Sequence, residues 1–210
     1  MNQSIIVDVT SVKEKIEYLR PFNVDILMAE DMTESLIRWE GWERFNPHTT
    51  LLVFPGNGAD ILRSYLPEDW LNHWQWTTCH AKRSWIPGQP PTVAAGRIFR
   101  EQMVLGLSDV ILIDDVISSG LTSKRVLRAN KPWLPGSRWH TVAWVAQKAH
   151  NVRGFTSYYA PIEVGDTKTK VPINSLSTLL RNSEIAKSYA KRNFGYKAQD
   201  FLSILKKIRL

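Results

Sequence analysis

Two adjacent carboxylates followed by a short hydroxyl-rich loop are the residues of this chain best suited to bind a charged ligand. Asp114 and Asp115 follow the apolar run 110–113 in the sequence VILIDDVISSGLT, and the loop 118–122 comes shortly after. The loop offers backbone N–H groups and hydroxyls at the expected start of a helix, where unpaired amides and the helix dipole both favour an anion. Residues of these types, in this order, can hold a sugar phosphate.

The segment from Val110 to Thr122 resembles the signature of the type I phosphoribosyltransferases, which bind 5-phosphoribosyl-1-pyrophosphate (PRPP). In that signature, four apolar residues precede two acidic residues, two mostly apolar residues and a loop rich in Ser, Thr and Gly. The resemblance implies that Asp114 and Asp115 hold the ribose 2- and 3-hydroxyls. It implies equally that the 5-phosphate is wrapped by the loop residues Ser118, Ser119, Gly120, Leu121 and Thr122.

An ordinary strand-to-helix turn, capped by Ser118 or Ser119, is the competing interpretation of the same segment. It does not explain two ionised carboxylates at the end of a buried strand, which are costly unless a ligand or metal uses them. Because the family uses PRPP as a magnesium complex, the resemblance implies Mg²⁺ as a cofactor that arrives with the ligand. Asp114 and Asp115 are then the candidate protein ligands of that ion.

A second candidate segment is the glycine-rich turn after the apolar run Thr49–Phe54. Its residues are Pro55, Gly56, Asn57 and Gly58. The resemblance implies that this turn binds pyrophosphate, and its glycines would let the backbone approach an anion closely. The turn departs from the family in having no Lys or Arg, since Arg63 lies a turn later. A simple glycine turn is the alternative.

The basic, proline-rich stretch 80–91 is the third candidate segment, and it contains Lys82 and Arg83. The resemblance implies a flexible loop that closes over the active site during catalysis. Closure would exclude water and place positive charge on the leaving pyrophosphate. A solvent-exposed linker is the competing interpretation.

Alternating strands and helices around these segments predict an α/β fold with a mainly parallel sheet flanked by helices. Strands are expected at 49–54, 74–79, 110–113, 139–145 and 156–160. Helices are expected at 11–19, 31–42, 60–66, 97–105, 121–129, 171–181, 182–192 and 198–208. The resemblance implies a Rossmann-like core. We expect a single domain over 1–210, with its core at about 46–165 and a small hood subdomain, formed by 1–45 and 166–210, that selects the acceptor.

Composition supports a compact protein of this kind. The 210 residues, 43% of them hydrophobic, suffice for one domain with an appended subdomain. No apolar run approaches the roughly 20 residues of a membrane span, and no signal peptide is indicated. The single cysteine, Cys79, suits a cytoplasmic protein and is expected to be a small buried residue rather than a nucleophile.

The net charge of +7 has its basic residues concentrated late in the chain. These residues are Lys187, Lys191, Arg192, Lys197, Lys206, Lys207 and Arg209. Nucleic acid is one candidate partner for the C-terminal helices. A positive field that serves PRPP and pyrophosphate is a second interpretation, and an ordinary solvated helix face is a third.

The implied reaction is displacement of pyrophosphate from C1 of PRPP by a nitrogen nucleophile such as a nucleobase. The 6-oxopurine enzymes carry an aspartate where this chain has Ser118, which weakens a hypoxanthine–guanine interpretation. One alternative is a non-catalytic PRPP sensor or nucleic-acid-binding regulator on the same fold, and another is a different phosphate-handling α/β enzyme. Because dimers are common in the family, the resemblance also implies a homodimer.

Overall fold

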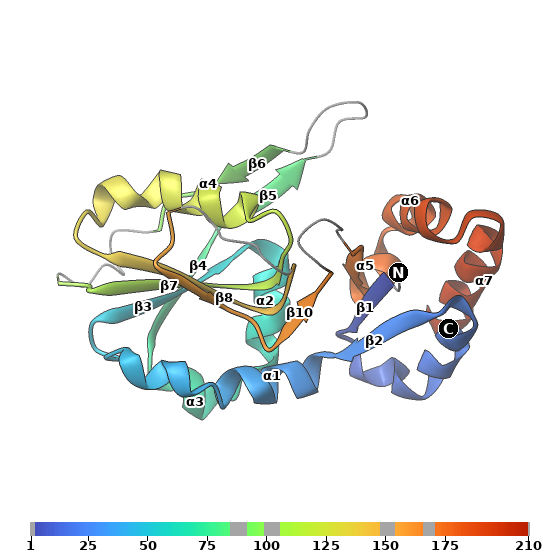
Figure 1. Ribbon diagram of the computed structural model, residues 1–210, viewed down its shortest axis with the longest axis horizontal. Helices are drawn as coiled ribbons and strands as arrows, with labels where there is room; N and C mark the ends of the chain where they lie inside the picture. The colour runs from blue at the N-terminus through green and yellow to red at the C-terminus, as the bar shows by residue number, and fades with distance from the viewer. Residues whose placement is uncertain (1–2, 85–91, 99–105, 148–153, 166–170, 210) are drawn as a thin grey trace. The chain divides into compact units, whose positions relative to one another are not determined.

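The computed structural model describes residues 3–84, 92–98, 106–147, 154–165 and 171–209 (Figure 1). The chain divides into two compact units. Residues 32–170 form the central unit, and residues 1–31 together with 171–210 form the terminal unit. Each unit is built around its own parallel sheet, so we describe them separately.

The central unit contains a six-stranded parallel sheet. Its strands are β3 (Thr50–Pro55), β4 (Gln75–Cys79), β7 (Asp109–Ile117), β8 (Arg138–Gln147), β9 (Ser157–Tyr159) and β10 (Ile162–Val164). The main path runs in the order β10-β8-β7-β3-β4, and β9 also pairs with β8. The inner strands are buried along almost their whole length because both faces of the sheet are covered, and their central residues are mostly apolar.

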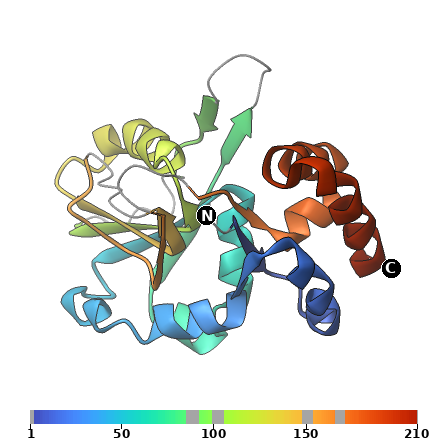
Figure 2. The same ribbon diagram turned by 45° about the vertical axis from the view of Figure 1, so that its right-hand side comes forward.

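Helices cover the two faces of this sheet, as Figures 1 and 2 show. They are α1 (Ala29–Ile37), α2 (Gly56–Tyr65), α3 (Glu68–Asn72) and α4 (Leu121–Asn130), with short 3₁₀ turns η2 (Glu40–Arg44) and η4 (Lys131–Trp133). Val53 and Leu112 point from neighbouring strands toward Val126 of α4 and are fully buried with it. Because side chains alternate along a strand, the intervening residues face the opposite side.

The order of connections creates a switch point between β3 and β7. From β3 the chain passes through α2 to β4 on one side, and it later returns to place β7 on the other side of β3. In open α/β sheets, ligands bind at the carboxyl ends of the strands where the winding direction reverses. The turn before α2 and the turn before α4 both leave the sheet at this point.

A two-stranded antiparallel hairpin adjoins the sheet. Its strands are β5 (Ala81–Ser84) and β6 (Thr92–Ala95). Strand β5 packs against both α2 and α4, which places it over the switch point. Lys82 and Arg83 therefore lie on a strand, whereas the sequence predicted a loop without regular structure; residues 85–91 of that loop lie outside the described residues.

The terminal unit has a three-stranded parallel sheet in the order β11-β1-β2. Its elements are β1 (Gln3–Val7), η1 (Thr10–Phe22), β2 (Val24–Met28), β11 (Ile173–Ser175), α5 (Leu176–Arg181), α6 (Ser183–Phe194), η5 (Gly195–Lys197) and α7 (Ala198–Arg209). Buried Asp8 accepts a hydrogen bond from the Ser177 N–H at 2.8 Å and another from the Ser177 hydroxyl. This joins the end of β1 to the first turn of α5.

The predicted α/β class with a mainly parallel sheet and flanking helices is confirmed. Several predicted boundaries are corrected. The expected helix 31–42 corresponds to α1, which ends at Ile37. The expected helix 171–181 begins only at Leu176, because residues 173–175 form a strand. Strand β7 extends to Ile117, because it continues to pair with β8 after its pairing with β3 has ended. Helix α2 begins at Gly56 rather than at residue 60, so its glycines form its first turn.

Several predicted elements differ more strongly. The sequence did not predict six strands, all of them short, namely β1, β2, β5, β6, β10 and β11. The predicted helix 97–105 lies largely outside the described residues, and its first two residues are not helical. Among the described residues, no helix combines the length and apolar character needed to cross a bilayer.

Candidate functional site

Asp114 and Asp115 lie at the switch point, where β7 continues beyond its neighbour β3. Pairing with β3 ends at Leu112, whereas pairing with β8 continues through Asp114 opposite Ala143. Alternation along the strand places Asp114 on the α4 face and Asp115 on the α2 face. The two carboxylates therefore point toward the two different helix starts that meet here.

The two carboxylates are held by the backbone of the same strand. The Asp115 N–H donates to Oδ1 of Asp114 at 3.0 Å, and the Val116 N–H donates to Oδ1 of Asp115 at 2.8 Å. Burial of Asp114, which is only 7% exposed, and the adjacent Asp115 charge together raise the pKa of Asp114 well above its usual value. Two acidic groups so placed disfavour ionisation unless a cation or hydrogen-bond donors join them.

The glycine turn contacts the α2 side of this pair. A Cβ atom added to Gly58 would lie 2.6 Å from Cγ and 2.7 Å from Oδ2 of Asp115, so any larger residue would displace this carboxylate. Gly56 has a positive φ of 72°, and a Cβ there would overlap the carbonyl oxygen of Ala81 at the start of β5. The N-cap, Pro55, offers no side-chain cap, so the first N–H groups of α2 have no helical acceptor.

The loop 118–122 contributes a second helix start on the α4 side. Gly120 is the N-cap of α4 in a left-handed conformation with φ 61°, and no side chain caps the helix. The competing interpretation required a cap from Ser118 or Ser119, which the structure does not show. Uncapped N–H groups and neighbouring hydroxyls can donate hydrogen bonds to a phosphate.

The hairpin brings one of its two basic side chains to the site. Nη2 of Arg83 donates to the Thr122 hydroxyl at 3.5 Å, and the Arg83 charge partly offsets the rise in the pKa of Asp114. Lys82 precedes Arg83 on β5, so its side chain projects from the opposite face of the hairpin. The structure therefore separates a pair that the sequence analysis treated together.

Mg²⁺ fits the donor atoms at this site. Carboxylate oxygens suit the ion, which proteins commonly bind through one or two carboxylates plus substrate phosphates. In the part of the chain that the structure describes, no group of three or more His, Cys, Asp or Glu residues could hold a metal. Asp114 and Asp115 are the carboxylates of this site that could contribute oxygen ligands to the ion.

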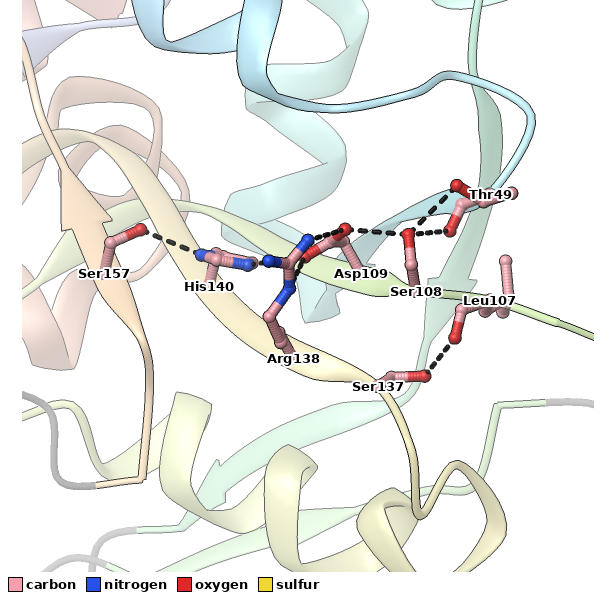
Figure 3. A network of polar contacts seen from close by, with 8 residues as sticks. All are labelled: Thr49, Leu107, Ser108, Asp109, Ser137, Arg138, His140 and Ser157. Atoms are coloured by element: carbon pink, nitrogen blue, oxygen red, sulfur yellow. Dashed lines mark hydrogen bonds and ion pairs between the residues drawn. The ribbon is translucent and has the colours of Figure 1, made fainter.

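A polar cluster that sequence reasoning missed lies at the opposite end of β7 (Figure 3). Buried Asp109 accepts hydrogen bonds from Nε and Nη2 of Arg138 at 2.9 and 2.8 Å and from Ser108 at 2.8 Å. It also contacts Nε2 of His140 at 2.9 Å, whose Nδ1 contacts the Ser157 hydroxyl. Asp109 is far in sequence from Arg138 and His140. The one sequence signal was that Arg138 and His140 are two positions apart at the start of a predicted strand, so their side chains share a face.

The Asp109 cluster is structural in character. Burial would raise the pKa of Asp109, but hydrogen bonds from Arg138, Ser108 and His140 outweigh it, so the pKa of Asp109 is lowered. At about 3.3 Å per residue along β7, it lies roughly 16 Å from Asp114. The cluster joins β7, β8 and β9 at the end of the sheet opposite the candidate site.

Cys79 is buried at the end of β4, with its thiol 3.2 Å from the carbonyl oxygen of Gly96. Burial raises the pKa of this thiol to about 11. A thiol in this state is a poor nucleophile at neutral pH. The structure thus agrees with the expectation of a small buried residue.

No protein-family model and no curated protein matches this chain. Its fold is similar to that of solved structures at low identity. Xanthine-guanine-hypoxanthine phosphoribosyltransferase of Helicobacter pylori is 14% identical, with a TM-score of 0.45 over 68% of this chain and 84% of that chain. A hypothetical protein from Neisseria gonorrhoeae with bound ppGpp is 16% identical, with a TM-score of 0.47 over 88% and 94% of the two chains. Purine phosphoribosyltransferase of Pyrococcus horikoshii is 14% identical, with a TM-score of 0.47 over 81% and 92%.

Proposed function

We propose that this protein is a phosphoribosyltransferase, which moves the 5-phosphoribosyl group of PRPP to a nucleobase or related nitrogen acceptor and releases pyrophosphate. The observation that carries the proposal is the position of Asp114 and Asp115. They lie at the switch point of a parallel sheet, between two helix starts that no side chain caps. PRPP has a phosphate at one end, a pyrophosphate at the other and ribose hydroxyls between them, which matches an acidic pair between two anion-binding helix starts.

The proposed binding mode assigns one part of PRPP to each part of the site. The loop 118–122 and the first turn of α4 would bind the 5-phosphate, and the turn 55–58 at the start of α2 would bind the pyrophosphate. Asp114 and Asp115 would hold the ribose hydroxyls between these two anion sites. Magnesium would screen the pyrophosphate and share the carboxylate oxygens, which makes pyrophosphate a better leaving group.

Catalysis at such a site consists mainly of positioning and charge stabilisation. Departure of pyrophosphate gives C1 the character of an oxocarbenium ion, as in glycoside hydrolysis. The anionic carboxylates would lie beside the ribose, where they favour the developing positive charge. Arg83 would lie near the 5-phosphate, since it contacts Thr122 of the loop 118–122. The nitrogen nucleophile forms its bond to C1 as pyrophosphate leaves with the electron pair of the C1–O bond, and the N–H proton of the acceptor passes to solvent.

The acceptor is the part of the reaction that the site specifies least. Ser118 stands where 6-oxopurine enzymes have an aspartate, which favours an acceptor other than hypoxanthine or guanine. The terminal unit includes most of the two segments predicted to form the hood over the acceptor. Its role in selecting the acceptor stays a prediction.

One observation favours a second candidate, a PRPP-binding regulator that does not catalyse transfer. The turn 55–58 has no Lys or Arg, and Lys82 projects away from the face that Arg83 presents to the site. Fewer cations around pyrophosphate would weaken stabilisation of the leaving group and leave ribose and 5-phosphate binding intact.

Release of pyrophosphate from Mg²⁺–PRPP in the presence of a panel of nucleobases distinguishes the two functions. We expect one class of base to stimulate release by wild-type protein and to appear as a ribonucleoside monophosphate. Asp114→Asn and Asp115→Asn should abolish this activity. If no base stimulates release although PRPP binds, the protein is a regulator; if PRPP does not bind, both functions are rejected.

A further inference from the structure

The helices α6 and α7 and the turn η5 that joins them present a strongly basic surface, which the proposed phosphoribosyltransferase site does not use. All of its basic side chains are exposed. We call this surface the basic helical face, and its residues are Lys187, Lys191, Arg192, Tyr196, Lys197, Lys206, Lys207 and Arg209. Figures 1 and 2 show α6 and α7 side by side in the terminal unit.

The amphipathic pattern of the two helices explains why their charged side chains are exposed. Tyr189 of α6 and Phe201 and Leu205 of α7 are buried in the core of the terminal unit, together with Phe22. Positions three and four residues apart share a helix face, so the remaining positions point to solvent. The packing that buries the apolar stripes therefore exposes the lysines and arginines.

The positive charge is not balanced within this part of the chain. Residues 171–209 contain only Glu184 and Asp200 as acidic residues, and Glu184 is 2.8 Å from Lys187 in an ion pair. By contrast, lysine and arginine on η1 of the same unit are paired, Lys13 with Glu30 and Arg20 with Glu17. Uncompensated, exposed positive charge on two adjoining helices is the electrostatic footprint of a polyanion site.

Tyr196 is the second, independent feature of the face. Its side chain is 91% exposed, the most exposed of the large hydrophobic residues in the described chain. It lies in η5 between the two helices, and Nζ of Lys197 lies 5.9 Å from its ring centroid. An aromatic ring that contributes nothing to the core, and lies beside a lysine, can stack on a nucleobase while its basic neighbour contacts a phosphate.

We propose that the basic helical face binds single-stranded nucleic acid, with an unpaired base stacked on Tyr196 and the backbone phosphates on the surrounding lysines and arginines. A duplex hides its base faces, so stacking selects a single strand. An anionic membrane fits less well, because interfacial helices insert an apolar face into the lipid. Here the apolar faces of α6 and α7 are already buried.

Fluorescence anisotropy with a labelled single-stranded RNA and a single-stranded DNA of the same sequence tests the proposal on the full chain. Tyr196→Ala should raise Kd by about 5- to 150-fold, the range that alanine substitution of stacking aromatics gives. Tyr18→Ala is the matched control, since Tyr18 is 49% exposed on η1 of the same unit. The control should leave Kd unchanged.

Salt dependence tests the contribution of the charges. Each lost phosphate contact lowers the slope of log K against log salt by about 0.7 for single strands. The double variants Lys191→Ala/Arg192→Ala and Lys206→Ala/Lys207→Ala should therefore each lower the slope by about 1.4. Lys13→Ala/Lys15→Ala removes the same charge from η1 and should leave the slope unchanged.

Three results would overturn the proposal. The first is equal loss of affinity in the η1 control variants, which would mean that only net charge matters. The second is equal or tighter binding to duplex of the same sequence. The third is no binding to either oligonucleotide at low salt, including the case in which the protein binds vesicles with anionic lipids. Stabilisation by Mg²⁺–PRPP, measured on the same variants, keeps this test separate from that of the proposed function.

Discussion

Gly58→Ala is the substitution that most sharply tests how the glycine turn and the acidic pair are related. The added Cβ would lie 2.6 Å from Cγ of Asp115, whereas carbon atoms in contact lie about 3.5–4.0 Å apart. The Asp115 side chain must therefore move by about 1 Å. Displacement of an active-site group by that distance costs on the order of 100-fold.

The same substitution should leave the fold intact. Gly58 lies in the first turn of α2, and a positive φ is not required there. Alanine is favoured over glycine in a helix by about 0.5–1 kcal/mol, which offsets the cost of moving one partly buried carboxylate. We expect the free energy of unfolding without ligand to change by less than about 1 kcal/mol.

Thermal unfolding with and without Mg²⁺–PRPP measures both consequences. Ligand at 100 times the wild-type Kd stabilises the protein by about 2.7 kcal/mol, and a 100-fold rise in Kd reduces this to about 0.4 kcal/mol. The shift in Tm should fall from roughly 5–11 °C to roughly 1–2 °C. Gly136→Ala is the control, since a Cβ there meets no atom within 4 Å. An undiminished ligand shift in Gly58→Ala would refute the proposed contact between turn, carboxylate and ligand.

Three further predictions concern the hairpin, the Asp109 cluster and the thiol. Arg83→Ala should weaken PRPP binding by about 3- to 10-fold in a calorimetric titration, whereas Lys82→Ala, on the opposite face of the hairpin, should not. Asp109→Asn should lower the free energy of unfolding by about 1–3 kcal/mol at pH 7. Because the folded-state pKa of Asp109 is lowered, the wild-type advantage in denaturant titrations should be complete above pH 3.8 and disappear as the pH falls below it. With a pKa of about 11, Cys79 should react with a thiol reagent at pH 8 on the order of 100-fold more slowly in the native protein than after unfolding.

The residues of the candidate site were predictable because they are contiguous in sequence. The order of strand, carboxylates, loop and helix in 110–122 predicts a ligand-binding turn by itself, and the structure has the strand and the helix of that order as β7 and α4. The contact between Gly58 and Asp115 was not predictable. It depends on β3 and β7 being neighbours in the sheet, which the sequence pattern does not state.

The parts of the fold that the sequence analysis missed depend on pairing between distant segments. Strand β1 pairs with β11 through Ser4 and Ile173, so neither short strand is complete without the other end of the chain. Both lack the length at which alternation of apolar and polar residues becomes distinct. The Asp109 cluster likewise joins three strands, and only their register brings Arg138 and His140 to Asp109.

Isothermal titration of Mg²⁺–PRPP into the wild-type protein and into Asp114→Asn tests most directly whether PRPP binds at Asp114. We expect saturable binding at one site per chain in the wild type, and binding at least 10-fold weaker in the variant, which keeps the shape of the side chain but loses its charge. Absence of binding to the wild type at millimolar PRPP would contradict the account. Equal affinity in Asp114→Asn would do so as well, because the ligand would then bind elsewhere.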